Sequence, residues 1–380
     1  MKKYYFDDNK KFIIEDYDKA KTFSSFLPGI AGVEGIPIWA FYVNRGQGIS
    51  SFGLENKNNP IMEFYPANSA YQTVTTNGFR TFVKDINKEG HVFEPFGANR
   101  KSCKRKMGIE KDSFFVQESN EVEGIDTQVS YTTLTNVPFG GLVRRTEITN
   151  TTNASKSLEI VDGMPALLPY GVDNEAYKAM SNLMQSWMEV SNRDTNVPFY
   201  KLRSSTEDVA VVSEIKSGYF YISESVVDDE VLNIYDASLI FDYQCDLRDP
   251  VGFRESSRQE LTAKEQVFAN KVPSAFQVAS RVIEPGATVV LNSIIGYAQD
   301  YEGVKNFSKD MDLDGFVQGQ FEACKTIIES ISSEIELQTG ISVFDEYMKQ
   351  SYLDNVLRGG RPYIFKSSKG NHVYHLFSRK

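Results

Sequence analysis

The chain has 380 residues, more than one domain usually contains, so a large unit with a smaller appended piece is expected. Its hydrophobic fraction of 41%, with 26 Gly and 13 Pro, is ordinary for a globular protein and excludes collagen-like and disordered classes. The formal net charge of −10, without a long run of Lys or Arg, argues against nucleic acid or an anionic membrane as a partner.

The cysteines and the first residues indicate the compartment. Cys103, Cys245 and Cys324 are odd in number, widely spaced and form no CxxC pair, which argues against a disulfide framework and a structural zinc site. The first residues turn acidic before any apolar run, and no apolar stretch approaches bilayer length. We therefore expect a soluble, cytoplasmic protein without a bound metal.

The segment 26–53 is unusually rich in glycine and aromatic residues. Its glycines allow positive φ, and Trp39, Phe41 and Tyr42 supply flat apolar faces. The Gly46-Gln47-Gly48 stretch matches neither a dinucleotide fingerprint nor a phosphate-binding loop. Packing of a glycine-rich hairpin and a ligand role are both compatible with this segment.

A short basic stretch, 100–106, has the composition of a solvated loop. Contact with a phosphate or with another subunit is the alternative.

The region from Phe79 to about Ala298 reads as short extended segments separated by turn residues, which is typical of antiparallel sheets. A large antiparallel two-sheet β-sandwich is the natural architecture. The candidate strands are rich in Val, Ile, Tyr, Phe and Thr and cover 128–133, 141–149, 157–161, 208–215, 219–223, 232–241 and 288–298.

One helix is expected inside this β region. After Asp173 and Asn174, which can cap it, apolar side chains recur at helical spacing up to Met188. This methionine-rich stripe is interpreted as a core face, with a binding groove as the alternative.

The pattern changes near Asp310. Apolar residues from Val317 to Ile331 fall on one face of an amphipathic helix, and a second helix is predicted from about Val343 to Leu357, with Gly359-Gly360 as its stop. These two helices are interpreted as a connector to another domain.

Residues able to perform glycosyl chemistry are abundant but not arranged in a diagnostic pattern. Glu34, Glu55, Glu63 and Asp162 are candidate acids, yet with 51 acidic residues a structural role is favoured for each. Only three histidines are present, no Gly-x-Ser-x-Gly elbow occurs, and the late histidine pair is read as part of a strand, not as a metal site.

Four blocks carry a resemblance to a known family. Segments 26–53, 59–68, 158–171 and 352–360, in this order, resemble the cellobiose-phosphorylase-like glycoside phosphorylases, and among them the β-1,3-glucan (laminari-oligosaccharide) phosphorylases. The resemblance extends over essentially the whole chain.

The resemblance implies an architecture and a chemistry. Residues 1–305 are expected to form a galactose-mutarotase-like β-supersandwich, 306–360 an α-helical linker, and 361–380 the start of a missing α/α-barrel domain. Such enzymes are inverting: phosphate, as co-substrate, attacks the anomeric carbon of a β-glucan while a barrel Asp protonates the glycosidic oxygen, which releases α-glucose 1-phosphate without a cofactor. The barrel position is absent from this sequence, so no catalytic residue is assigned.

The resemblance leaves a supporting role for this chain. Its β part could contribute to a site that an α/α-barrel domain completes, in cis or in trans, or to a site across a homodimer interface. The candidate substrate-binding residues are Trp39, Arg45, Gln47, Glu63 and Arg358. Arg45 and Arg358 could contact phosphate or a sugar hydroxyl through their forked donors, although such arginines more often form structural ion pairs.

Three functions are compatible with the sequence. The first is the amino-terminal part of a glucan phosphorylase, inactive without the barrel domain, and the second is a non-catalytic carbohydrate-binding or assembly module. The third, a stand-alone sandwich enzyme of the epimerase or lyase type, would need convergent histidines. The first predicts an exposed apolar docking surface around the two late helices.

Overall fold

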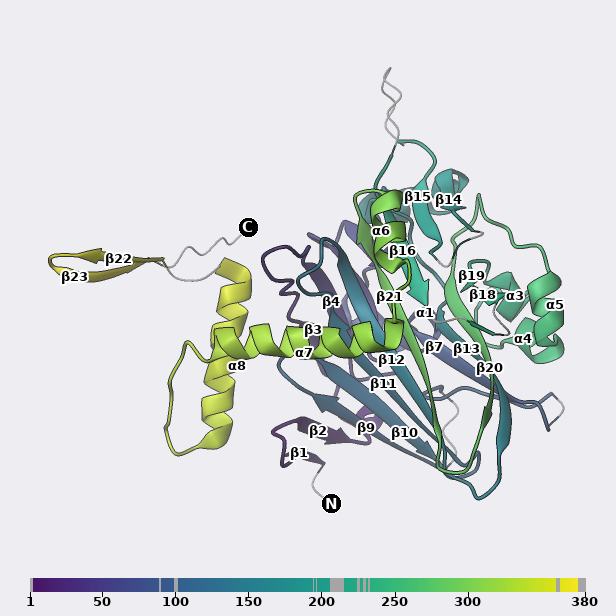
Figure 1. Ribbon diagram of the computed structural model, residues 1–380, viewed down its shortest axis with the longest axis horizontal. Helices are drawn as coiled ribbons and strands as arrows, with labels where there is room; N and C mark the ends of the chain where they lie inside the picture. Colours follow the sequence, from purple (N-terminus) through teal and green to yellow (C-terminus); the bar gives the residue numbers. More distant parts are fainter. Residues whose placement is uncertain are drawn as a thin grey trace.

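The computed structural model describes residues 3–88, 90–98, 102–193, 195, 197–205, 215–223, 226–227, 230–231, 233–359 and 363–374. The fold is mainly β and its sheets are antiparallel (Figure 1), as the sequence predicted.

The largest sheet has ten strands. In spatial order they are β1 (Tyr4–Phe6), β2 (Phe12–Glu15), β9 (Cys103–Ile109), β10 (Phe114–Asn120), β11 (Ile125–Thr133), β12 (Gly140–Asn150), β21 (Thr288–Ala298), β16 (Gly218–Ser223), β15 (Phe199–Leu202) and β14 (Met188–Ser191).

Two smaller sheets complete the sandwich. The five-stranded sheet has the order β19 (Asn233–Ile234), β20 (Ala275–Ile283), β13 (Lys156–Met164), β7 (Arg80–Asp85) and β8 (Val92–Phe93). The four-stranded sheet has the order β3 (Ser24–Leu27), β4 (Ile38–Val43), β5 (Ile49–Leu54) and β6 (Asn59–Met62). The pairs β17 (Val226–Val227) with β18 (Glu230–Val231) and β22 (Tyr363–Ser367) with β23 (Gly370–Tyr374) form separate hairpins.

Successive side chains on each strand of the large sheet point to opposite faces, so the sheet contributes to two separate cores. In β16, Tyr219 and Tyr221 pack into the core that also includes residues of the two smaller sheets, such as Phe52 and Met164. The intervening Phe220 packs with the helices α6 (Tyr301–Ser308) and α7 (Leu313–Ser332). The smaller sheets therefore cover one face of the large sheet, and α6 and α7 cover part of the other (Figure 1).

Short helices fill the connections between strands. They are η1 (Tyr17–Lys19), α1 (Ala67–Asn77), α2 (Asn174–Met180), η2 (Ser181–Trp187), α3 (Ser238–Phe241), α4 (Val251–Glu255) and α5 (Arg258–Ala263). Helices α3, α4 and α5 pack against the five-stranded sheet through Phe241, Phe253 and Leu261. They lie at the side of the molecule opposite the C-terminal hairpin (Figure 1).

The two predicted late helices are present as α7 and α8 (Ser342–Gly359). Val317, Cys324 and Ile328 are buried on the predicted face of α7, which fixes this helix on the sandwich. Helix α8 crosses the end of α7 and, with the β22–β23 hairpin, forms an arm that extends from the sandwich (Figure 1). The domain boundaries at 305 and 360 stay predictions.

Four expectations need correction or lie outside the described residues. Segment 232–241 is not one strand, because Asp236 accepts hydrogen bonds from the Ser238 backbone N–H and hydroxyl and starts α3 directly after β19. The helix after Asp173 changes to a 3-10 helix at Ser181 and ends at Trp187, so Met188 begins a strand. The strand expected at 208–215 lies outside the described residues up to 214.

The basic stretch is the remaining correction, because its second half is β9 and not a solvated loop. Arg105, which alternation places on the inner face of this strand, is 4% exposed. A charge run can therefore contain a core residue when it belongs to a strand.

The glycine-rich segment forms the β4–β5 hairpin, as one of its two interpretations predicted. Gly46 and Gly48 have φ of 52° and 90° in the turn. A Cβ at Gly48 would lie 2.5 Å from the Phe114 ring, so this glycine is required both for its backbone conformation and for space.

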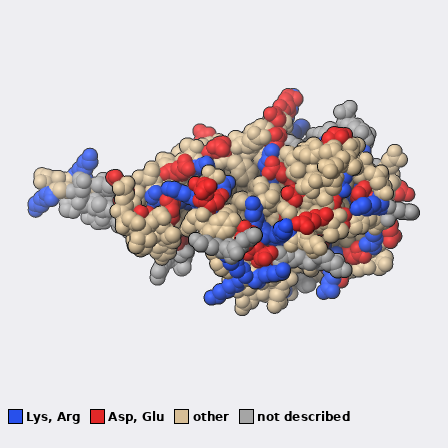
Figure 2. Space-filling model, turned by 90° about the horizontal axis from the view of Figure 1, so that it is seen from below, with Lys and Arg blue, Asp and Glu red and all other residues tan. Residues whose placement is uncertain are grey.

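The surface carries charges of both signs. On the face shown in Figure 2, Lys and Arg are intermixed with Asp and Glu. Among the described residues, no helix is both long enough and apolar enough to cross a lipid bilayer.

Candidate functional site

Two of the predicted substrate-binding residues lie in one neighbourhood. The Trp39 indole Nε1 donates to the carbonyls of Leu54 and Asn56 at 3.0 and 2.9 Å, and its ring lies edge-on to Phe64 with centroids 5.9 Å apart. Glu63, next to Phe64, accepts a hydrogen bond of 2.7 Å from the Tyr65 hydroxyl. This is an aromatic, half-buried surface, and its role in substrate binding stays a prediction.

Arg45 belongs to a different region, at the turn of the β4–β5 hairpin. Its guanidinium donates to the carbonyls of Tyr17, Ala20 and Asn44 at 3.3, 3.1 and 2.6 Å, and it thereby ties the hairpin turn to η1. Contact with phosphate or a sugar stays a prediction. Arg358 lies in α8, but its side chain is outside the described part of the structure.

Gln47 lies in the core, 2% exposed, within a polar network between the two large layers. Its amide donates to the Thr81 hydroxyl at 2.9 Å and accepts from Arg144 Nη2 at 2.8 Å. Arg144 also forms a bidentate ion pair with Asp162, and both side chains are at most 1% exposed. This network occupies both functional ends of the Gln47 amide, and it accounts for Asp162 as a structural acid.

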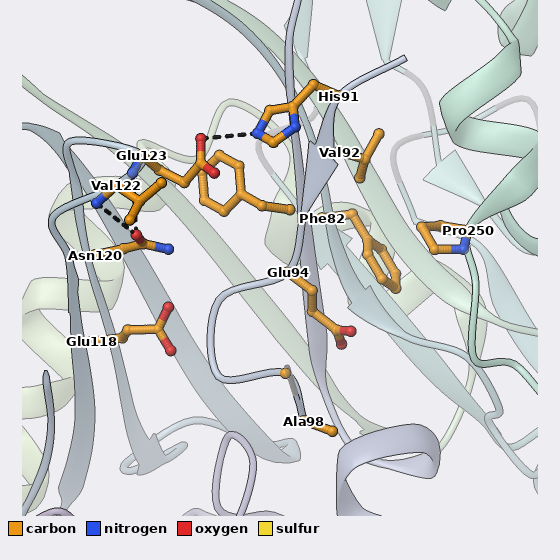
Figure 3. A pocket seen from close by; sticks show the side chains of 12 residues that line it. Phe82, His91, Val92, Glu94, Ala98, Glu118, Asn120, Val122, Glu123 and Pro250 are labelled. Atoms are coloured by element: carbon orange, nitrogen blue, oxygen red, sulfur yellow. Dashed lines mark hydrogen bonds and ion pairs between the residues drawn. The ribbon is translucent and has the colours of Figure 1, made fainter. Parts of the chain in front are cut away.

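A cavity of about 370 Å³ lies between the large sheet and the five-stranded sheet (Figure 3). Glu118 and Asn120, two residues apart on β10, point from one wall, because alternate residues of a strand share a face. Glu94, directly after β8, lies across from them, and His91 and Glu123 lie at one end (Figure 3). The cavity is the candidate functional site.

Arg105 holds Glu118 in place. Its Nε donates to Glu118 Oε2 at 2.6 Å, its Nη1 to Asp18 at 3.0 Å and its Nη2 to the Gly97 carbonyl at 2.8 Å. The Phe96 backbone N–H donates to the same Glu118 oxygen at 2.8 Å. Although burial alone would lower the pKa of Arg105, the charges of Glu118 and the other neighbours raise it, so this guanidinium keeps its positive charge near neutral pH.

Arg80 holds Glu94 in the same way. Its Nε and Nη2 donate to the two carboxylate oxygens at 2.6 and 2.9 Å, and its guanidinium also contacts the carbonyls of Leu247 and Arg248, which precede the cavity residue Pro250. Burial raises the pKa of Glu94 above its ordinary value despite the charge of Arg80. As pH falls, Glu94 therefore takes up a proton at a higher pH than an ordinary glutamate does.

At the end of the cavity, His91 Nε2 lies 2.9 Å from Glu123 Oε2, and Lys88 Nζ lies 3.5 Å from the same oxygen. Val92, Phe93 and Pro250 add apolar surface. The arrangement offers fixed hydrogen-bonding groups beside an apolar wall, which is the usual composition of a small-molecule site. Among the described residues, no cluster of His, Cys, Asp and Glu has metal-binding geometry.

Sequence reasoning missed this cavity. Glu118 and Asn120 lie on β10, which was not among the strands predicted individually. Glu94 and His91 flank β8 of another sheet, and only the packing of the two sheets brings these residues together. The one signal in the sequence that could have pointed to this cavity was His91, a histidine beside an extended segment.

A second hollow lies where α8 meets the edges of the sheets. This groove of about 430 Å³ is lined by aromatic and aliphatic residues of β1 to β3 and α8, which include Phe6, Phe26, Leu27, Val343 and Tyr347. Charged residues, Lys10, Glu110, Lys111 and Glu346, complete its lining. Phe6 and Phe26 are 42% and 54% exposed, and Val343 and Tyr347 are 58% and 64% exposed. We call this hollow the α8 groove.

No protein-family model and no curated protein matches the chain. Solved structures that match the chain include a polysaccharide lyase, with 10% identity and a TM-score of 0.38 over 72% of this chain. They also include a bacterial glucoamylase in complex with acarbose, with 8% identity and a TM-score of 0.37 over 81% of this chain. A protein described as a kojibiose phosphorylase from the human microbiome has 6% identity and a TM-score of 0.27 over 93% of this chain. This chain spans 34%, 41% and 33% of the three proteins, respectively.

Proposed function

We propose that this chain is the β-sandwich part of an inverting glycoside phosphorylase that acts on β-glucans and depends on an α/α-barrel domain for its catalytic acid. The observation that carries the proposal is the apolar surface of α8. Ile341, Val343, Phe344 and Tyr347, before and within the first two turns of this helix, are each at least 45% exposed. An apolar patch of this kind marks a protein interface.

The packing of α8 supports the same reading. Leu353 is fully buried against α7, so the second half of α8 is held by the sandwich. The first half has apolar residues directed away from that contact, and a helix that is apolar on more than one side is typical of a buried helix. A second domain seated on the arm would bury this surface.

The β22–β23 hairpin gives independent support. It extends from the end of α8 and away from the sandwich (Figure 1), and its Phe365 is 57% exposed. An isolated two-stranded hairpin is marginally stable in water at best. Packing against a further domain would stabilise it.

The proposed chemistry needs one protein acid. In an inverting hydrolase a second carboxylate activates water, whereas in a phosphorylase the phosphate ion is itself the nucleophile. The proposal therefore places the acid in the barrel domain, and this chain supplies the docking surface and the carbohydrate-related sandwich.

The test is an assay in the synthetic direction. Phosphate release from α-glucose 1-phosphate, with glucose or laminaribiose as acceptor, is measured for this chain alone and after addition of the barrel domain of a laminari-oligosaccharide phosphorylase. We expect no release from the chain alone and release from the mixture.

Two outcomes contradict the proposal. Activity of the chain alone would place a complete site within these residues. A mixture that associates but stays inactive on all acceptors would favour the alternative, a non-catalytic carbohydrate-binding or assembly module.

A further inference from the structure

We infer that the cavity between β8 and β10 is a binding site for a neutral saccharide unit, selective against anionic sugars. The inference does not depend on the phosphorylase proposal, because it rests on the groups that line the cavity.

One oxygen of the Glu118 carboxylate is left for a ligand at the cavity wall. Glu118 is 2% exposed, and both hydrogen bonds it accepts, from Phe96 N–H and Arg105 Nε, end on Oε2. Among the described residues, nothing bonds to Oε1, although the side chain lines the cavity. A carboxylate oxygen that faces a cavity can accept a hydrogen bond from a donor that a ligand brings.

Asn120 supplies the complementary donor on the same wall. Its Oδ1 accepts from the backbone N–H groups of Val122 and Glu123 at 3.2 and 3.1 Å, which fixes the orientation of the amide. The Nδ2 group has no partner among the described residues, and it lies on the same side of β10 as the Glu118 carboxylate (Figure 3).

An acceptor and a donor at this spacing suit adjacent hydroxyl groups. Glu118 and Asn120 are two residues apart in an extended strand, so their side chains stand roughly 6 to 7 Å apart at the backbone. A hydroxyl group both donates and accepts, so one hydroxyl of a sugar can donate to Glu118 Oε1 while another accepts from Asn120 Nδ2. Phe93 offers an apolar face for the C–H groups of the ring.

The charges around the cavity select against anions. Its lining contains the carboxylates of Glu94, Glu118 and Glu123 and no Lys or Arg among the described residues. The ion pairs behind the wall join five carboxylates to three cations: Glu94 to Arg80, Glu118 and Asp18 to Arg105, and Glu123 and Asp85 to Lys88. Arg80 and Arg105 are 2% and 4% exposed, so they neutralise the carboxylates without reaching the cavity. A phosphate or uronate group would therefore meet repulsion.

The experiment is ligand-observed NMR and titration calorimetry on the full chain. The probes are glucose, galactose and laminaribiose as neutral sugars, and glucuronate and glucose 6-phosphate as anionic ones. We expect at least one neutral sugar to bind, and each anionic probe to bind at least tenfold more weakly than glucose or not at all.

Two variants test the place of binding. Asn120→Asp keeps the Oδ1 acceptor that forms the turn but replaces the Nδ2 donor by an acceptor, and Val122→Trp fills the cavity from a position that is 66% exposed. We expect a loss of affinity of about tenfold for the first and no binding for the second. The matched control is Asn56→Asp, because Asn56 Oδ1 forms a similar turn through the Asn58 N–H, away from the cavity.

Three results would overturn the inference. If no neutral sugar binds to folded wild-type protein at tens of millimolar, the cavity is not a saccharide site. If Asn120→Asp and Val122→Trp bind as tightly as Asn56→Asp, the sugar binds elsewhere. If glucuronate or glucose 6-phosphate binds best, the charge argument is wrong. Phosphorolysis in the mixing assay is measured separately, so its failure is distinguishable from a failure to bind sugar.

Discussion

At the scale of single residues, the buried pair of Arg144 and Asp162 joins the two main layers of the sandwich. Arg144 belongs to β12 of the large sheet and Asp162 to β13 of the five-stranded sheet. Thr81 and Gln47 bond to the pair from β7 and from the hairpin turn. Four separate segments are thus fixed by one guanidinium and one carboxylate.

Substitution of Arg144 by Met should lower the free energy of unfolding by about 3–5 kcal/mol, because Asp162 would be left buried without its counter-charge. Urea denaturation followed by fluorescence measures this change. The control is Arg248→Met, which removes an ion pair to Asp246 whose side chains are 78% and 52% exposed. That pair should contribute at most about 1 kcal/mol. Equal effects of the two substitutions would show that the buried pair does not hold the layers together.

Asp236 is also nearly inaccessible to solvent, and it makes a pH-dependent contribution to the free energy of unfolding. Although burial alone would raise its pKa, hydrogen bonds from Lys271, Ser238 and the backbone N–H of Val267 lower it below its ordinary value of 3.8. Because the folded pKa is the lower one, the stabilisation is present above the unfolded pKa and is lost as pH falls through the folded pKa.

Asp236→Asn should therefore lower the free energy of unfolding at neutral pH and flatten its dependence on pH below about 4. Denaturation curves at a series of pH values, with the exposed Asp8→Asn as control, check this result. A pH dependence identical to that of the wild type would mean that Asp236 does not titrate differently in the folded and unfolded states.

At the scale of elements, α7 is fastened to the large sheet by polar contacts as well as by its apolar face. Gln320, 6% exposed, accepts a hydrogen bond of 2.7 Å from the Thr135 backbone N–H, which follows β11. Asp314, near the start of the helix, receives hydrogen bonds from Asn292 and Arg145 on β21 and β12. Helix α7 is thereby fixed in register on the sheet, and it sets the place from which α8 departs.

Replacement of Gln320 by Leu should cost about 1–3 kcal/mol, because the Thr135 N–H would lose its partner in a buried position. Thermal and urea denaturation measure the loss. Gln318→Leu is the matched control on the exposed side of the same helix, where Gln318 bonds to Asp314, and its effect should stay within about 0.5 kcal/mol. If both variants lose the same stability, helix propensity and not the buried hydrogen bond is responsible.

The sequence predicted elements well where local chemistry decides them. The strand 288–298 was predicted with the bounds that the structure has, because β-branched residues follow a clear Pro-Gly turn. Segment 232–241 was predicted wrongly, because the Asp236 carboxylate starts a helical turn inside an apolar run. The cavity could not be predicted, since its walls come from strands of two sheets whose pairing depends on long-range packing.

At the scale of the whole molecule, exposed apolar residues gather at the end that carries the arm. Phe6 and Phe26 from the sheet edges and Val343, Phe344 and Tyr347 from α8 are all at least 42% exposed, and four of them line the α8 groove. The candidate saccharide cavity is lined by different elements, β8 and β10 with their connections, so binding and docking can be changed independently.

The docking surface gives the last prediction. Tyr347→Glu places a further charge in the lining of the α8 groove, and because Tyr347 is 64% exposed, the melting temperature of the chain alone should change little. Binding of the barrel domain should fall at least tenfold, since Lys10 and Lys111 in the groove already pair with Glu346, and a further carboxylate buried at the interface without its own counter-charge is unfavourable. Calorimetric titration with the barrel domain measures the affinity, and phosphate release from the mixture should fall in parallel. Tyr243→Glu is the matched control, because Tyr243 is 73% exposed and follows α3, away from the groove. Undiminished affinity of Tyr347→Glu would place the barrel on another surface, whereas an equal loss in both variants would reflect the added charge and not the groove.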